Sequence, residues 1–136
     1  MRYILAILAV GGMVVSYLAL RVHYDTGSAP CSINEKWDCG VVNHSEYAEI
    51  GHVPVATIGI AGYSLLTLLS LCALKRLTLL AAVAGFAFAL YLTFVESRIL
   101  HVWCLYCVTS QAIIAAIALL SAIYFFQRGP QRETLR

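Results

Sequence analysis

Four long apolar runs and one long polar stretch make up most of this 136-residue chain. A helix that crosses a membrane needs about 20 mainly apolar residues, and each run is close to that length. We therefore expect membrane-spanning helices over about residues 3–21, 53–74, 77–95 and 103–126. The polar stretch, about residues 22–52, is expected to form a loop between the first two spans.

Short connections between the last three runs favour an antiparallel arrangement. Lys75 and Arg76 are expected to form a tight turn, and Glu96 to Val102 a short connection. Small residues in the second and third runs allow helices to approach closely in lipid; they are Gly59, Gly62, Ala81, Gly85 and Ala89. The fold class predicted is all-α: a single integral membrane domain over residues 1–136, built as a four-helix bundle with a large loop between its first two helices.

Composition supports the membrane assignment. Hydrophobic residues make up 61% of the chain and charged residues 12%, whereas about 25% of residues are charged in an average soluble domain. The first run could instead be a signal peptide, but it is longer than the roughly 7–15 residues of a signal-peptide core. We expect it to be retained as a helix. A net charge of +2 without a basic run gives no indication of nucleic acid binding.

The polar loop has a predicted short helix of its own. Asn43 and Glu46 have the spacing of a capping box, in which the first side chain caps the helix and the second reaches back. The helix would extend to about Ile50 and be ended by Gly51 and Pro54.

Basic residues predict the orientation. With both termini cytoplasmic, the inner side has six: Arg2, Lys75, Arg76, Arg128, Arg132 and Arg136. The outer side then has Arg21, Lys36 and Arg98. The excess of basic residues on the cytoplasmic side predicts a multi-pass protein of the plasma or inner membrane with an extracytoplasmic loop.

Cysteines are the candidate reactive groups. Cys104 and Cys107 form a Cys-x-x-Cys motif at the start of the last span, where the N-terminus of a helix favours the nucleophilic thiolate. Cys31 and Cys39 lie in the polar loop. The predicted orientation places both pairs on the outer side, where disulfides persist. Cys72 is near the inner end of the second span and is expected to be a small buried apolar residue.

Two interpretations of the cysteines stay open after zinc is set aside, because their spacing differs from the usual pairs of short Cys-x2–4-Cys units. The first is a thiol–disulfide relay, in which each thiolate reaches the next sulfur through a mixed disulfide. The second is a structural or assembly membrane subunit whose cysteines form bracing disulfides. The relay is our preferred interpretation, since four apolar helices can form a stable bundle without needing disulfides to hold it together.

A relay at the membrane face needs an electron acceptor. The chain has neither a GxGxxG motif nor a span with paired histidines, which disfavours nicotinamide, flavin and haem. A lipid quinone, menaquinone or ubiquinone, needs only an apolar slot with one or two polar groups. Gln111 lies one turn after Cys107 and is the most polar side chain in the spans, although it could instead bond to a neighbouring helix. We expect Gln111, Ile58, Gly62 and Tyr91 to bind the quinone.

An ordered set of residues between about 30 and 110 resembles the vitamin K epoxide reductase family in its prokaryotic single-domain form, without a fused thioredoxin domain. The set comprises Cys31-x7-Cys39, Ser45, Gly51, Pro54, Gly59, Tyr63 and Cys104-x-x-Cys107. The resemblance implies a four-helix bundle around a quinone and a separate thioredoxin-like soluble partner on the outer side. It also implies that Cys31 meets the partner, that Cys39 bridges to Cys104, and that Cys107 faces the quinone.

Two positions depart from the vertebrate members that reduce epoxides. Those members have an Asn early in the second span and a Tyr four residues after the last cysteine, where this chain has Val55 and Gln111. The departures favour plain quinone chemistry over epoxide reduction.

Overall fold

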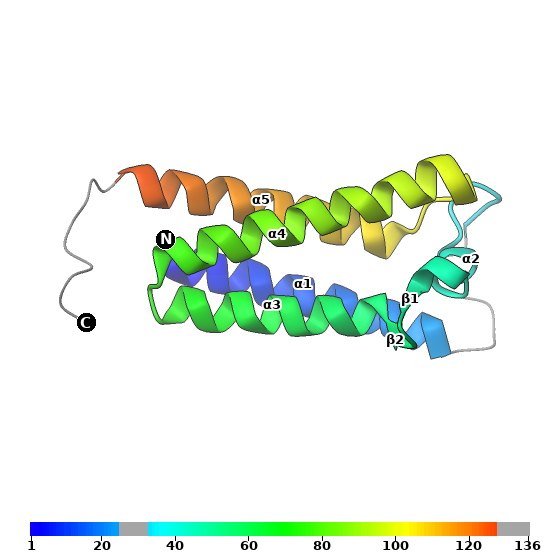
Figure 1. Ribbon diagram of the computed structural model, residues 1–136, viewed down its shortest axis with the longest axis horizontal. Coiled ribbons are helices and arrows are strands. Elements are labelled where there is room, and N and C mark those ends of the chain that lie inside the picture. Colours follow the sequence, from blue (N-terminus) through cyan, green and yellow to red (C-terminus); the bar gives the residue numbers. More distant parts are fainter. Residues whose placement is uncertain (25–32, 128–136) are drawn as a thin grey trace.

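The computed structural model describes residues 1–24 and 33–127. Four helices run lengthwise through the molecule: α1 (Arg2–Tyr24), α3 (Val55–Leu71), α4 (Lys75–Phe94) and α5 (Leu105–Gln127). Helix α1 packs most closely on α3, and α4 packs on α5. The short elements of the polar loop lie together at one end of the bundle (Figure 1). The N-terminus lies at the other end.

Three helical segments are long and apolar enough to cross a membrane: Arg2–Tyr24, Lys75–Leu100 and Leu105–Gln127. Val55–Leu71 is a shorter apolar helix. These helices indicate a mainly α-helical membrane protein, as the apolar runs predicted.

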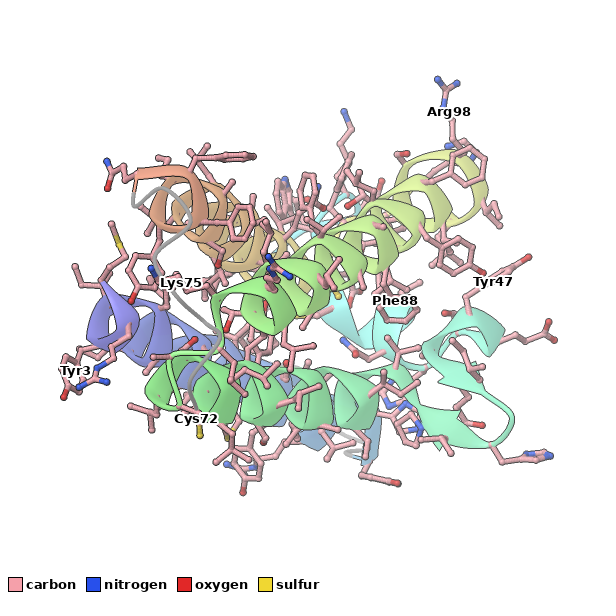
Figure 2. All side chains as sticks on the ribbon, turned by 60° about the vertical axis from the view of Figure 1, so that its left-hand side comes forward. Tyr3, Tyr47, Cys72, Lys75, Phe88 and Arg98 are labelled. Carbon is pink, nitrogen blue, oxygen red and sulfur yellow. The ribbon has the colours of Figure 1, made fainter. Side chains whose placement is uncertain are left out.

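The turn between α3 and α4 differs from the prediction. Helix α3 ends at Leu71, and Ala73 closes the turn in the left-handed region at φ 58°. Lys75 and Arg76 therefore belong to the first turn of α4 and do not form the turn themselves. Cys72 lies in this turn and is exposed, so the prediction that it is buried is wrong. Figure 2 shows Cys72 at the opposite end of the molecule from Tyr47 and Arg98.

Helix α4 also continues further than expected. It passes directly into a π-helical segment, η2 (Val95–Leu100), where the sequence predicted a connection. His101, at φ 54°, ends this segment. The connection to α5 is therefore reduced to residues 101–104.

Close helix contacts occur at three glycines. A Cβ atom on Gly59 would lie 2.7 Å from the Ser16 hydroxyl oxygen, and one on Gly85 would lie 3.2 Å from Ile114. Gly12, which the sequence analysis passed over, lies against the ring of Tyr63. Tyr63 belongs to a buried cluster with Leu5, Ala9, Leu66, Ala82, Ile114 and Ile117, so these contacts fix the interior of the bundle.

Inside the loop, the predicted helix beginning at Asn43 is wrong. The structure has an earlier helix, α2 (Cys39–Asn43), which Asp38 caps by accepting hydrogen bonds from two backbone N–H groups of its first turn. Asn43 ends α2 and turns its side chain inward. A 3-10 turn, η1 (Glu46–Ala48), follows without a side-chain cap.

A small hairpin completes the loop. Strands β1 (Glu49–Ile50) and β2 (Val53–Pro54) pair antiparallel around Gly51 and His52. Both turn residues have positive φ, 57° and 67°, as a two-residue hairpin turn of type I′ requires. The hairpin leads directly into α3.

Candidate redox site

Two backbone hydrogen bonds join the loop to the segment before α5. The Trp103 N–H donates to the Lys36 carbonyl at 2.7 Å, and the Asp38 N–H donates to the Trp103 carbonyl at 3.0 Å. Trp37 forms a parallel bridge with Trp103, and their ring centroids are 6.3 Å apart. This short ladder holds the start of α2 against the Cys-x-x-Cys motif.

The ladder brings Cys39 and Cys104 into one apolar cluster with Val22 and Val42. Both cysteines are completely buried, with 0% exposure. Cys39 is disulfide-bonded, whereas Cys104 and Cys107 are free thiols. Cys31, the other predicted loop cysteine, lies outside the described residues.

Asn43 connects the two halves of the site. Its side-chain amide donates to the Cys39 carbonyl at 2.8 Å and to the Cys104 sulfur at 3.5 Å. Sequence reasoning assigned Asn43 to a helix cap and so missed this role. The contact with Cys104 joins residues 61 positions apart in the chain, and no local pattern could have indicated it.

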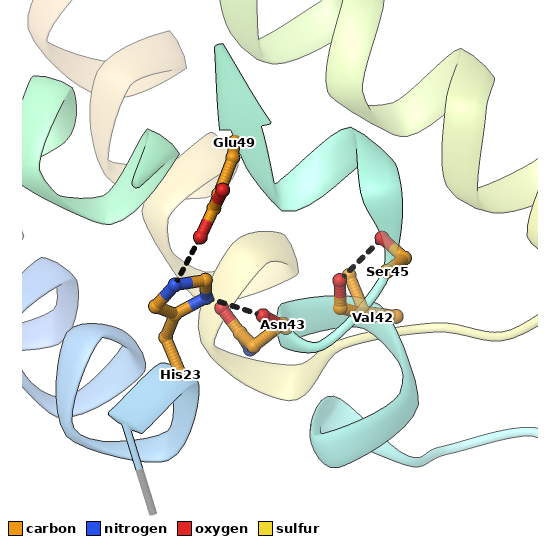
Figure 3. A network of polar contacts seen from close by, with 5 residues as sticks. All are labelled: His23, Val42, Asn43, Ser45 and Glu49. Carbon is orange, nitrogen blue, oxygen red and sulfur yellow. Dashed lines mark hydrogen bonds and ion pairs between the residues drawn. The ribbon is translucent and has the colours of Figure 1, made fainter. Parts of the chain in front are cut away.

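A second network fixes the loop to the end of α1 (Figure 3). His23 makes one ring-nitrogen contact with the Asn43 carbonyl at 2.5 Å and another with the Glu49 carboxylate at 3.1 Å. The Ser45 hydroxyl donates to the Val42 carbonyl at 2.7 Å. These contacts hold the backbone from which the Asn43 side chain reaches Cys104.

Glu96 is a further site residue that the sequence analysis did not select. Its carboxylate accepts a hydrogen bond from the Cys104 N–H at 3.2 Å, and its side chain also bonds with the Cys107 thiol. Glu96 is only 3% exposed. An acidic residue at the end of an apolar run is a signal that could have identified it, because ionisable groups at membrane depth are usually functional.

Cys104 precedes α5, and its carbonyl accepts the first bond of that helix, from the Val108 N–H at 3.0 Å. A hydrogen bond from the Cys107 side chain lowers the pKa of the Cys104 thiol, and burial and the nearby Glu96 charge only partly oppose this. Cys104 is thus the cysteine prepared to act as a thiolate, while Cys107 supplies the donating S–H group.

An apolar cavity of about 360 Å³ lies among the four long helices, below the loop. Cys107 and Glu96 line it, and Asn43 contributes at its loop end. The other polar or aromatic lining residues are Ser16, Ser45, Tyr47, Tyr63, Phe88, Thr93, Tyr106 and Ser110. Apolar ligand sites in proteins have volumes of about 300–1,000 Å³, so the cavity can accept an aromatic ring beside the Cys107 sulfur.

The predicted quinone-binding residues fall into two groups. Ile58 and Gly62 line the cavity. Tyr91 is 50% exposed and, like Gln111, is not part of the lining. The Gln111 side chain instead accepts a hydrogen bond from the Thr93 hydroxyl on α4. Quinone binding by these four residues stays a prediction.

Comparison with known proteins identifies a family whose sequence pattern the chain matches. The Vitamin K epoxide reductase family matches residues 3–122 of the chain. None of the curated proteins compared with the chain matches it. Within residues 1–24 and 33–127, no group of three or more His, Cys, Asp or Glu side chains is arranged to hold a metal ion.

Proposed function

The chain belongs to the vitamin K epoxide reductase family, and from this premise we propose that it is a thiol:quinone oxidoreductase that generates disulfides. Members of the family are membrane oxidoreductases associated with quinones and thioredoxin-like partners. The observation that carries the proposal is the position of Cys107. Its thiol lines the apolar cavity while bonding to Cys104, which packs against Cys39.

The cavity suits a quinone ring in both shape and chemistry. Its walls are mainly apolar, and Ile58 and Gly62 would flank the ring. Glu96 and Asn43 add polar groups at the end nearest the cysteines. A bound quinone would supply the two-electron acceptor for the dithiol, and its tail would extend into lipid.

We assign the relay as follows. A reduced thioredoxin-like partner donates two electrons to the loop disulfide through Cys31. The Cys39 thiolate then attacks Cys104 of an oxidised Cys-x-x-Cys pair and releases the Cys107 thiolate. Attack by Cys31 on the Cys39–Cys104 bond restores the loop disulfide and leaves Cys104 and Cys107 reduced. The disulfide-bonded Cys39 and the free Cys104 and Cys107 correspond to this last state.

The same state argues against disulfides that only brace the loop. A disulfide that only braces the loop gives no role to the two free thiols of the Cys-x-x-Cys motif, one of which lines the cavity. The distribution of basic residues supports an orientation with the loop outside and both termini cytoplasmic. This compartment favours disulfide formation.

The test is quinone reduction by the purified protein in detergent. A reduced thioredoxin-like protein is the electron donor, and short-tailed ubiquinone and menaquinone analogues are offered separately while quinone absorbance is followed. Turnover should require Cys107, and Cys107→Ala should abolish it. Cys72→Ala is the matched control, because Cys72 lies in the turn at the far end of the bundle. Thiols whose alkylation is unchanged by quinone would instead support bracing disulfides.

A further inference from the structure

We propose that Glu96 is the catalytic base and proton carrier of the quinone-reducing step. This inference rests on the proposed function, because it assigns a residue to the reaction between the Cys-x-x-Cys pair and the quinone. Glu96 would take the proton of the Cys107 thiol and pass it to an oxygen of the quinone.

The first argument is the position of the carboxylate. Glu96 bonds to the Cys107 side chain and to the Cys104 N–H, and it lines the cavity that Cys107 also lines. The group is therefore in contact with the reacting thiol and with the space that the quinone would occupy. A base must lie within hydrogen-bonding reach of the proton that it removes, and Glu96 meets that condition.

The second argument is the lack of a structural reason for a charge at this place. Glu96 is almost completely buried, and no ion pair involving it is found among the described residues. Burying a carboxylate without a cationic partner is costly. Accepting one backbone hydrogen bond from Cys104 could be done equally well by a neutral amide, so the position does not need an acid for that purpose.

The third argument is the absence of another base. The remaining titratable side chains among the described residues that line the cavity are Tyr47, Tyr63 and Tyr106. Tyrosine is protonated near neutral pH, and the Tyr63 hydroxyl is already bonded to the Ser110 carbonyl and hydroxyl. Cys104 accepts the hydrogen bond from Cys107, but it is itself a reactant. Glu96 is left as the group that can remove the Cys107 proton.

The step balances as follows. The S–S bond between Cys104 and Cys107 forms as the pair loses two electrons and two protons. The quinone gains both electrons and becomes the quinol. Glu96 carries one proton, from Cys107 to a quinone oxygen. The other proton is exchanged with water. The Cys104 thiol gives its proton to water when it becomes the thiolate, and the quinol takes up its second proton from water.

Glu96→Gln separates a positioning role from a catalytic one. The amide oxygen can still accept from the Cys104 N–H, but the side chain can no longer take up a proton. General base catalysis contributes about 100- to 10,000-fold, so single-turnover quinone reduction by the prereduced protein should slow by at least about 100-fold. Glu96→Asp should recover much of the rate. Glu46→Gln, the same change on an exposed loop carboxylate, should leave the rate within about twofold of the parent protein, since exposed surface changes have small effects.

A second readout needs no quinone. Ferricyanide oxidises the dithiol by accepting electrons but no protons, so the Cys107 proton should remain on Glu96. The oxidised-minus-reduced infrared spectrum should then gain a carboxylic acid C=O band that shifts in D2O. The band should be absent from Glu96→Gln and present in Glu46→Gln. If Glu96→Gln fails to fold, the infrared spectra of the parent protein and of Glu96→Asp still test whether Glu96 takes up the proton.

The outcomes distinguish this inference from the proposed function. A parent protein that reduces no quinone would overturn the proposed function. Normal turnover in Glu96→Gln, or a parent spectrum without the carboxylic acid band, would overturn the role of Glu96 and leave thiol:quinone exchange intact.

Discussion

Replacing Gly12 by alanine should disrupt the contact between α1 and α3, whereas the same change at Gly11 should not. A Cβ atom at Gly12 would lie 2.3 Å from Cε1 and 2.4 Å from Cζ of Tyr63, but one at Gly11 would have no atom within 4 Å. The Tyr63 ring borders the cavity, but its hydroxyl end is held in place. It is 5% exposed, and its hydroxyl is held by the Ser110 carbonyl and hydroxyl at 2.9 and 2.8 Å.

The expected difference in the free energy of unfolding comes from the contact with Tyr63, because the other effects of the two substitutions are the same. Both exchange glycine for alanine within α1, so the gain in helix propensity, about 1 kcal/mol, cancels in the comparison. Overpacking at Gly12 costs about 1–3 kcal/mol. Displacing the ring far enough to break one bond to Ser110 would add about 1 kcal/mol. Gly12→Ala should therefore be less stable than Gly11→Ala by about 1–4 kcal/mol.

Reversible unfolding in mixed detergent micelles can measure this difference. Tyr63→Ala provides the decisive background, because removing the ring should remove the penalty at Gly12 and show the two sites as coupled. Equal stability of Gly11→Ala and Gly12→Ala with the tyrosine present would refute the packing argument. A penalty that persists in the Tyr63→Ala background would place its cause elsewhere than in the ring contact.

Three further predictions concern the relay and the topology. Cys107→Ala should accumulate a Cys39–Cys104 disulfide, because Cys104 can still attack Cys39 of the loop disulfide but no Cys107 thiolate remains to resolve the product. Mass spectrometry after acid trapping and alkylation checks this, and a cross-link from Cys104 to the other loop cysteine would reverse the loop roles. Cys72→Ala should reduce quinone at a rate within about twofold of the parent protein, since that thiol lies in the exposed turn away from the site. A loss of activity as large as that of Cys107→Ala would mean that the proposed order of cysteines is wrong. A reporter that works only in the cytoplasm should be active when it is fused after Arg136. A fusion that is accessible from outside would overturn the predicted orientation.

The helices could be predicted from sequence because apolar runs of sufficient length have few other outcomes in a membrane. Their ends were less predictable. Lys75 and Arg76 were assigned to the turn because they are charged, yet they begin α4, since the turn depends on Ala73 in a left-handed conformation. The continuation of α4 into η2 was likewise missed, because a π-helical segment has no distinct hydrophobic period.

The cysteines of the candidate site could be selected from their spacing, but the groups around them could not. Asp38 and Asn43 are both good capping residues, and the capping-box spacing with Glu46 led to the choice of Asn43. Asp38 caps α2, while the Asn43 amide bonds to Cys39 and Cys104. Glu96 looked like part of a polar connection because its contact with Cys104 depends on the register of η2. Each of these roles arises from tertiary packing.

Complete burial of Cys39 and Cys104 would exclude other thiols from the proposed exchange between them. Thiol–disulfide exchange requires access of the attacking thiolate to a sulfur atom, and neither sulfur has accessible surface for a small thiol from the surrounding water to reach. In the proposed relay, electrons from the loop would therefore reach Cys104 through Cys39 and not directly from a small thiol. In the proposed relay, a quinone bound beside Cys107 would thus be insulated from small thiols in solution, and the direction of electron flow would depend on which protein reaches the loop.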